Sequence, residues 1–274
     1  MIRGLLVFAL ILSAQDRGSQ PSPRIVSLAP SLTEILVDLG ATASIVGVTR
    51  YERDSAVASV PRVGGWVDPS LEAVLALQPD LVLLTRAQEA FVGPGLRRLG
   101  LRYRTLPARH LQDVFLSLDS LGKWLHLETR ATRLKQALQE TLQAYRQRAA
   151  RVRRIPVVFV ADRTPGTLQN LYLVGRGTFL HELLEATGFE NLVRQTGYVP
   201  VNAEYLVQLD PPWILEMVQG VSLPRPVEQG SPDPAWRRAG LADRVIRLNA
   251  DLFSHPSTRF PILLRILWQI HEAR

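Results

Sequence analysis

Cysteine is absent from the 274 residues, and its absence excludes several kinds of site. Without it the chain cannot form disulfides, bind zinc through thiolates, or carry the lipid that bacterial lipoproteins attach to a cysteine. Enzyme motifs such as Gly-x-Ser-x-Gly and His-Glu-x-x-His are also missing. The five histidines, at positions 110, 126, 181, 255 and 271, are dispersed, whereas a zinc site needs several to converge. We therefore expect no catalytic residue, no metal site and no resident cofactor.

Lysine is almost absent as well. Only Lys123 and Lys135 occur among the 32 Lys and Arg residues, which outnumber 25 Asp and Glu. The arginines are spread over predicted helix faces, and the run from Arg146 to Arg154 ends a helix, where positive charge is favourable. Scattered arginines do not form a nucleic-acid groove, so we expect no nucleic-acid partner.

The sequence begins with a short apolar run. Arg3 precedes the apolar stretch from Leu5 to Leu12, and the small residues Ser13 and Ala14 follow it. This pattern, over residues 1–14, is typical of a secretory signal and is too short to span a bilayer as a mature helix. Residues 15–23 are expected to be a flexible lead-in. We therefore predict export to the periplasm or another extracytoplasmic space; the alternative is an uncleaved N-terminal anchor.

One pattern occurs twice in the chain. An aromatic residue follows a glycine and a glutamate lies six positions later, as Trp66 with Glu72 and as Tyr198 with Glu204. Each glutamate falls in the first turn of a predicted short helix that a proline ends, and a buried strand follows. The repetition predicts two lobes of similar build.

Each repeated residue has two interpretations. A glutamate in a first turn favours its helix start whatever else it does, and Ser70 and Asn202 are plausible N-caps for the two helices. An aromatic side chain beside a loop glycine more often lines a surface, but it can also close a core. The sequence alone leaves both interpretations open.

Strands and helices alternate through the chain from Arg24 onward, which is typical of parallel α/β sheets. We predict an N-terminal lobe over 24–125, an inter-lobe helix within 126–154 and a C-terminal lobe over 155–274. The fold class is α/β: two Rossmann-like lobes with parallel sheets, joined by a long rigid helix, with a ligand cleft between the lobes. Ligands of such sheets bind at the carboxyl ends of the strands, where the predicted loops hold Tyr51, Trp66, Thr85 and Arg86.

Several motifs together resemble one protein family. They are Arg24-Ile-Val-Ser-Leu-Ala-Pro-Ser-Leu-Thr-Glu34, the blocks Trp66 to Leu83 and Tyr198 to Leu209, and Asp251-Leu-Phe-Ser-His-Pro-Ser-Thr-Arg259. With export and two α/β lobes joined by a helix, they resemble the substrate-binding proteins of ABC importers whose lobes are hinged by a helix. The likeness runs over about residues 24–272, and within the family it is greatest to the cobalamin binders.

The resemblance assigns roles by position. It implies that Glu72 and Glu204, one on each lobe, dock onto arginines of the membrane permease. The aromatic residues that line the cleft in the cobalamin binders match Tyr51, Trp66, Tyr198 and Tyr172, and Asp251 and His255 fall in the last ligand loop. Thr85, Tyr198 and Leu252 replace tryptophans of those proteins, so this cleft has fewer indoles.

We therefore expect an exported monomeric carrier that binds cobalamin or a related corrinoid and has no catalysis of its own. A haem or ferric-siderophore carrier of the same family is the first alternative. Haem would require a tyrosine or histidine on the iron, and an anionic siderophore would require a cluster of arginines. An alternative of another class is a two-lobed chelatase that inserts metal into a tetrapyrrole, with a histidine and a carboxylate facing each other in the cleft.

Overall fold

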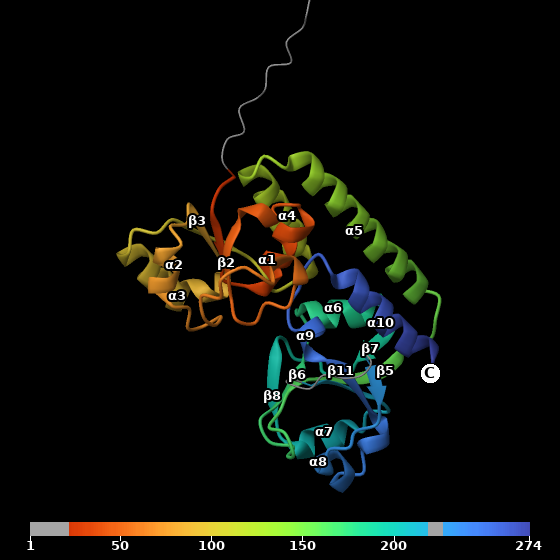
Figure 1. Cartoon of the computed structure of the whole chain (residues 1–274). Helices are drawn as coiled ribbons and strands as arrows, with labels where there is room; N and C mark the ends of the chain where they lie inside the picture. Colours follow the sequence, from red (N-terminus) through yellow and green to blue (C-terminus); the bar gives the residue numbers. More distant parts are fainter. Residues whose placement is uncertain (1–21, 219–226) are drawn as a thin grey trace, which may run out of the picture.

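The computed structural model describes residues 22–218 and 227–274 and shows two α/β lobes beside a long helix (Figure 1). The predicted signal segment and most of the lead-in lie outside the described residues. Among the described residues, no helix combines the length and the apolar character needed to cross a membrane.

The N-terminal lobe has a four-stranded parallel sheet. Its order is β2 (Ile45–Val48), β1 (Ile25–Ser27), β3 (Leu81–Thr85) and β4 (Tyr103–Leu106). Its helices are α1 (Pro30–Asp38), α2 (Leu71–Ala76), α3 (Glu89–Arg98) and α4 (Leu111–Trp124), with the short 3-10 turns η1 (Thr42–Ser44), η2 (Ser55–Val57) and η3 (Arg86–Gln88). The predicted parallel sheet is confirmed in this lobe.

The C-terminal lobe has a mixed sheet of seven strands. Their order is β10 (Val227–Gln229), β11 (Val245–Asn249), β9 (Ile214–Val218), β5 (Ile155–Asp162), β6 (Leu171–Val174) and β8 (Tyr198–Val201), and β7 (Phe189–Asn191) pairs with β5. The ladders with β6, β8 and β10 are antiparallel, so the prediction of a parallel sheet is wrong for this part of the lobe. No helix separates β5 from β6, and a parallel pair needs such a crossover.

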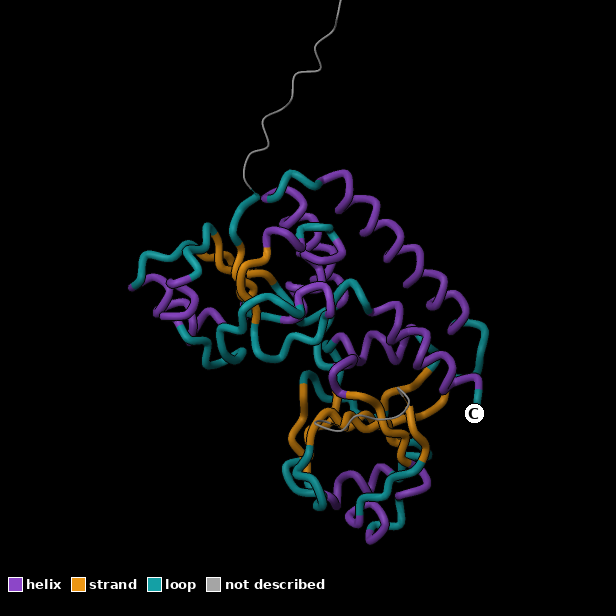
Figure 2. The backbone as a smooth tube through the Cα atoms, in the orientation of Figure 1, coloured by secondary structure: helices purple, strands orange, loops and turns teal. Residues whose placement is uncertain are grey.

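Helices cover both faces of the C-terminal sheet (Figures 1 and 2). They are α6 (Phe179–Ala186), α7 (Ala203–Leu209), α8 (Pro234–Arg238), α9 (Ala250–Phe253) and α10 (Phe260–Glu272), with the 3-10 turn η4 (Ala242–Arg244). Buried Leu206 of α7 and Trp236 of α8 share one apolar cluster on one face. The other face packs with α6 and α10 into a second cluster, which is much larger.

The helix starts test the predicted caps. Ser70 Oγ accepts the Ala73 N–H at 3.2 Å, and Asn202 Oδ1 accepts the Tyr205 N–H at 3.0 Å, so both predicted N-caps are confirmed. Helix α1 begins at Pro30, because the fixed φ of proline suits a first helical turn. The inter-lobe helix begins at Glu128, inside the range 126–154 predicted to contain it.

The inter-lobe helix α5 (Glu128–Ala149) runs along one side of both lobes (Figure 1). It lies against α4 of the first lobe, where a Cβ on Gly122 would come within 2.5 Å of the Ala131 Cβ, and against α6 and α10 of the second. Its buried Leu138 and Leu142 belong to the large apolar cluster, which draws members from both lobes. The lobes therefore share one core.

A second connection between the lobes was not predicted. Residues 254–259, which precede α10, contact the N-terminal lobe through polar groups. Thr258 Oγ1 donates to Asp38 Oδ2 at 2.5 Å, and Arg259 forms ion pairs with Asp54 and, at 3.7 Å, with Glu34. The lobes are thus held by a shared core along α5 and by ion pairs beside it.

We expect the lobes to move little when a ligand binds between them. Rotation would have to separate packed apolar side chains of the shared core and break the pairs of Arg259, whereas hinge motion is easiest where a few loop residues absorb it. Small-angle X-ray scattering curves with and without ligand should nearly superpose. A large fall in the radius of gyration on binding would contradict the shared core as a rigid brace.

Candidate ligand cleft

A cavity of about 1200 Å³ lies between the two lobes. Typical small-molecule pockets hold ~300 to 1,000 Å³, so this one suits a large ligand. The N-terminal lobe contributes Ala29, Pro30, Ser31, Glu34, Tyr51, Glu52, Arg53, Trp66, Thr85, Arg86, Ala87, Pro107, Ala108, Arg109, His110 and Asp113. The C-terminal lobe contributes Thr178, Phe179, Gly197, Tyr198, Ala250, Asp251, Ser254, His255 and Pro256. Most N-terminal lining residues follow the carboxyl ends of β1 to β4.

Five of the six predicted ligand-binding residues lie in the wall of this cavity. They are Tyr51, Trp66, Tyr198, Asp251 and His255. Asp251 lies in the short helix α9 rather than in the loop predicted for it, and Tyr198 opens strand β8 rather than lying in a loop. Their contact with a ligand stays a prediction.

Tyr172, the sixth, is not among the lining residues. It lies in strand β6, and its side chain is exposed. Because it pairs with Pro200 while Val174 pairs with Tyr198, the ladder places it on the same face as Tyr198. It is therefore beside the cleft rather than in its wall.

Trp66 is held by a buried glutamine that the sequence analysis missed. Gln88 Nε2 donates to the Trp66 carbonyl and to the Leu28 carbonyl, both at 2.8 Å. Gln88 Oε1 accepts from the N–H and the hydroxyl of Thr85, at 2.8 and 2.9 Å. The Trp66 loop is thereby tied to the ends of β1 and β3, and the indole also packs against Phe91, with 5.5 Å between ring centroids.

Tyr198 supplies an exposed aromatic group to the C-terminal wall, beside the buried Phe179. Its side chain is 47% exposed, toward the cleft, where the walls displace bulk water from the phenol. This burial raises the pKa of Tyr198 to about 12, although the positive charge of Arg109 opposes the shift. The phenol therefore keeps its proton at neutral pH and can donate a hydrogen bond.

His255 and Glu34, which both line the cavity, form a histidine–carboxylate pair between the two lobes. His255 Nε2 lies 3.5 Å from Glu34 Oε1, and its Nδ1 lies 3.0 Å from the Ser254 hydroxyl. Burial raises the pKa of Glu34, but hydrogen bonds from His255 and Ser257 and the charge of Arg259 outweigh it and hold the pKa below its ordinary value. Both nitrogens of His255 thus have partners within the protein.

A second histidine–carboxylate pair was not predicted. His110 is the N-cap residue of α4, and its Nδ1 lies 2.9 Å from Oε1 of Glu182 in α6. The other carboxylate oxygen, Oε2, accepts the Leu111 N–H at 2.9 Å. Glu182 of one lobe therefore fixes the ring of His110 and the start of a helix in the other. No sequence signal could connect positions so far apart.

Charges of both signs line the cleft. The cationic side chains are Arg53, Arg86 and Arg109, all exposed. The acidic ones are Glu34, Glu52, Asp113 and Asp251. The only ion pair between these two sets is the long contact of Arg53 with Asp251, at 3.8 Å. The cleft is polar but close to balanced in charge.

Glu72 and Glu204 lie outside the cleft. Both are exposed in the first turns of α2 and α7, which lie far from α5 on their lobes (Figure 1). Glu72 accepts a hydrogen bond from the Ser70 hydroxyl at 3.3 Å, and neither glutamate forms an ion pair with the described residues. An exposed apolar residue follows each at the third position, Leu75 and Val207.

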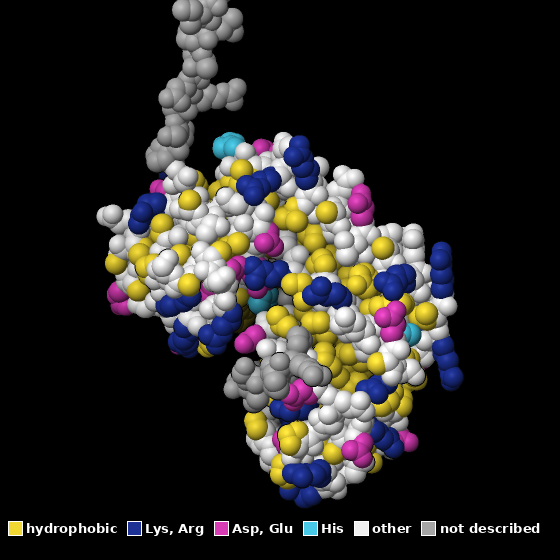
Figure 3. All heavy atoms as spheres, turned by 45° about the vertical axis from the view of Figure 1, so that its right-hand side comes forward, with side chains coloured by type: hydrophobic (Ala, Val, Ile, Leu, Met, Phe, Trp, Pro, Cys, Tyr) yellow, Lys and Arg dark blue, Asp and Glu magenta, His cyan; other side chains and the backbone are white. Residues whose placement is uncertain are grey.

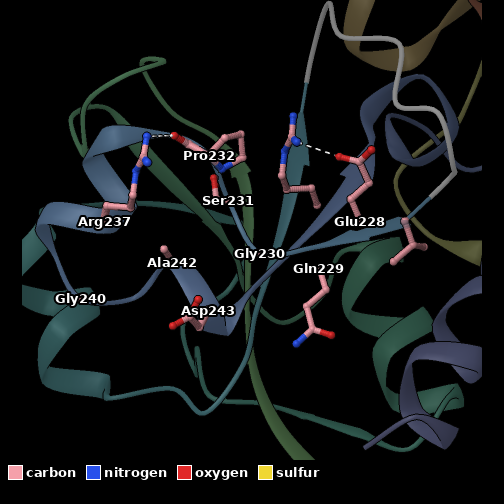
Figure 4. Close-up of a pocket in the computed structure, with 11 residues that line it drawn as sticks. Glu228, Gln229, Gly230, Ser231, Pro232, Arg237, Gly240, Ala242 and Asp243 are labelled. Carbon is pink, nitrogen blue, oxygen red and sulfur yellow. Dashed lines mark hydrogen bonds and ion pairs between the residues drawn. The ribbon is translucent and has the colours of Figure 1, made fainter.

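The C-terminal lobe has a second hollow, of about 930 Å³, beside β10 and α8 (Figure 4). Three of its four charged groups have partners: Arg247 pairs with Glu228 at 2.8 Å, and Arg237 donates to the Pro232 carbonyl at 2.6 Å. On the face in Figure 3, Lys and Arg side chains are scattered among acidic and apolar ones. Neither feature competes with the cleft as a site.

Within the described ranges, no group of three or more His, Cys, Asp or Glu side chains could hold a metal ion. The histidine–carboxylate pairs, His110 with Glu182, His255 with Glu34 and His181 with Glu185, belong to no such group.

The chain matches a family model and several curated proteins. The model described as periplasmic binding protein matches residues 25–251. An uncharacterised ABC transporter substrate-binding lipoprotein, YvrC of Bacillus subtilis, is 29% identical over 208 residues, 73% of this chain and 65% of YvrC, so this chain spans just under two thirds of that relative. The high-affinity heme uptake system protein IsdE of Staphylococcus aureus is 27% identical over 80% of this chain and 77% of IsdE.

Solved structures share the fold. A periplasmic heme-binding protein of Pseudomonas aeruginosa has a TM-score of 0.75 and 26% identity, covering 90% of this chain and 92% of that one. The periplasmic vitamin B12 binding protein of Vibrio cholerae has a TM-score of 0.73 and 22% identity, covering 91% and 96%. At that identity the second likeness shows the fold alone.

The Glu34 pair makes a prediction about acid stability. Glu34→Gln should lower the free energy of unfolding at neutral pH by ~1.5 to 3 kcal/mol, because hydrogen bonds to a charged group are lost. The pKa of Glu34 lies below 4.5 in the folded state, so its contribution is present above that pH and is lost as the pH falls through the folded value. The difference from wild type should therefore shrink in acid.

Urea unfolding of both proteins, at neutral pH and in acidic steps, measures this difference. Glu140→Gln is the control, since Glu140 is exposed on α5 and accepts only from Gln136; its effect should stay within ~0.5 kcal/mol at every pH. A Glu34→Gln difference that is unchanged in acid would mean that the ionised carboxylate contributes nothing.

Proposed function

This chain belongs to the periplasmic binding protein family, and from that premise we propose that it captures a corrinoid in its cleft and delivers it to an ABC importer. The family is one of binding proteins rather than enzymes. The pair of His255 and Glu34 does meet the geometric condition for a chelatase, but both groups are engaged with their neighbours, and nothing else supports catalysis.

The size and the aromatic walls of the cleft support a tetrapyrrole-sized ligand. Tyr51 and Trp66 come from one lobe and Tyr198 from the other, so flat apolar surface is available on both sides of a cavity of about 1200 Å³. Aromatic contacts contribute ~0.5 to 1.5 kcal/mol beyond the area that they bury. A macrocycle could thus contact both lobes at once.

The charge balance of the cleft is the observation that favours a corrinoid. Four carboxylates and three arginines line it. Glu34, Glu52 and Asp113 already accept hydrogen bonds or ion pairs from the protein, so Asp251 is the carboxylate that a ligand could most readily reach. The rim of a corrinoid carries neutral amides, which can donate to carboxylates and accept from guanidinium groups. The two propionates of haem can use only the arginines. A cleft with both kinds of partner fits the amides better.

Haem is the second candidate, and two observations favour it. The relatives from Staphylococcus aureus and Pseudomonas aeruginosa are named for heme. The exposed arginines Arg86 and Arg109 have no carboxylate within ion-pair distance among the described residues, and guanidinium groups bind carboxylates well. Tyr198 lines the cleft, and a phenol that ligates ferric iron gives up its proton, so the pKa of about 12 makes that exchange costlier without preventing it.

We expect the purified protein to bind cyanocobalamin one to one. Trp66→Ala should weaken binding by roughly tenfold or more, because it removes a large aromatic contact and its buried area. Isothermal calorimetry measures the affinity, and mass spectrometry identifies copurified small molecules.

Trp124→Ala is the matched control, because Trp124 lies exposed at the end of α4 and outside the cleft wall. Its affinity should equal that of wild type. If cyanocobalamin gives no heat and the Soret band of haem shifts when the protein is added, the ligand is haem and not a corrinoid.

Glu72 and Glu204 support the proposed delivery step. Two carboxylates without ion-pair partners, each beside an exposed apolar residue, occupy equivalent places on two lobes. A permease with two-fold symmetry could bind both through arginines. The same glutamates also favour their helix starts, which is worth only ~0.3 to 1 kcal/mol each.

Charge reversal separates delivery from capture. The double variant Glu72→Lys with Glu204→Lys should keep the corrinoid affinity and lose uptake into vesicles that contain the importer, since losing one partner of a buried charge pair costs ~2 to 5 kcal/mol. The control, Glu128→Lys with Glu140→Lys, makes the same charge change on α5. Uptake by the first variant at the wild-type rate would disprove docking, and lost corrinoid binding would place the glutamates in the pocket.

A further inference from the structure

His110 is the one cleft histidine that has a free ring nitrogen among the described residues. Its side chain is 39% exposed and lines the cavity. Nδ1 is occupied by Glu182 at 2.9 Å, while Nε2, on the other flank of the ring, has no hydrogen-bond partner in the described part of the chain. His255, by contrast, has both nitrogens engaged.

The contact with Glu182 fixes which nitrogen carries the proton. A carboxylate accepts hydrogen bonds, so Nδ1 of the neutral ring is protonated and the lone pair is on Nε2. This arrangement of carboxylate, imidazole and lone pair is how proteins orient histidines that ligate metals. Glu182 is itself held by the Leu111 N–H at 2.9 Å, so the ring cannot easily turn away.

We propose that Nε2 of His110 coordinates the central metal of the bound ligand, with Glu182 as its positioning residue. The inference rests on the proposed function, since a single imidazole cannot hold a free ion and the described residues offer no cluster that could. A metal already held by four macrocycle nitrogens needs only an axial ligand. One oriented histidine is enough for that.

The step is a ligand substitution. In aquocobalamin the lone pair of Nε2 forms a bond to cobalt, the bond from cobalt to water breaks, and the water leaves; no oxidant or reductant takes part. The position of His110 also suits the step, because the adjacent Arg109 and the nearby Phe179 and Tyr198 place it where the two lobes meet. A macrocycle that contacts both walls would therefore lie beside the imidazole of His110.

The test compares aquocobalamin, whose water exchanges, with cyanocobalamin, whose cyanide does not exchange readily. Wild type should shift the visible absorption of aquocobalamin on binding, and cyanocobalamin should bind without that shift. His110→Ala should abolish the shift and weaken aquocobalamin binding, and added imidazole should restore the spectrum. Glu182→Ala should weaken the binding of aquocobalamin by roughly tenfold to a hundredfold, as loss of an orienting partner does. Glu182→Gln should weaken it by less.

Two controls complete the design. His126→Ala alters an exposed histidine outside the cleft and should leave affinity and spectrum unchanged. Co²⁺ alone should not bind. If aquocobalamin binds without a spectral shift, or if the shift persists in His110→Ala, His110 does not coordinate the metal although the corrinoid function stands. If no corrinoid binds at all, the proposed function fails first, and haemin titrated into wild type and His110→Ala then decides whether His110 ligates iron.

Discussion

The packing of apolar side chains between the two lobes determines most of what this molecule can do. Helix α4 of one lobe, helices α6 and α10 of the other, and the inter-lobe helix α5 contribute to a single cluster, in which Phe115 and Phe260 meet edge to face at 6.2 Å. Separating the lobes would expose this surface at ~25 cal/mol for each Å². The shared core therefore opposes any change in the width of the cleft.

A preformed cleft changes how binding energy is used. When a ligand must first close two lobes, the free energy of that closure is subtracted from its binding free energy. A cavity that is already formed has no such cost. Several lining residues are also held in place by hydrogen bonds or ion pairs, as a preformed cleft requires. Gln88 fixes the loop of Trp66, Glu182 fixes His110, and Glu34 is fixed by His255 and Arg259. Fewer indoles can suffice where the remaining groups are held in place.

The sequence predicted what depends on neighbours in the chain. Periodicity predicted the alternation of strands and helices, and capping residues located the short helices with Glu72 and Glu204, because Ser70 and Asn202 act within one turn. The sequence did not predict the contacts of Gln88, the pair of His110 with Glu182, or the ion pairs of Arg259, since each joins residues far apart in the chain. Antiparallel β6 was missed because a loop without a helix carries no sign of strand direction.

Rigidity also constrains how a ligand could leave. Helices α2 and α7 lie far from α5, so a partner that held Glu72 and Glu204 at a spacing other than their own would apply force at the ends of both lobes (Figure 1). The contacts of residues 254–259 with Asp38, Asp54 and Glu34 are polar and lie beside the cleft, and they would break before the apolar core. Because His255 and Asp251 belong to the same region of the wall, loosening it would disturb one side of the site directly. Under the proposed function, the importer rather than the ligand would then do the work of opening the cleft.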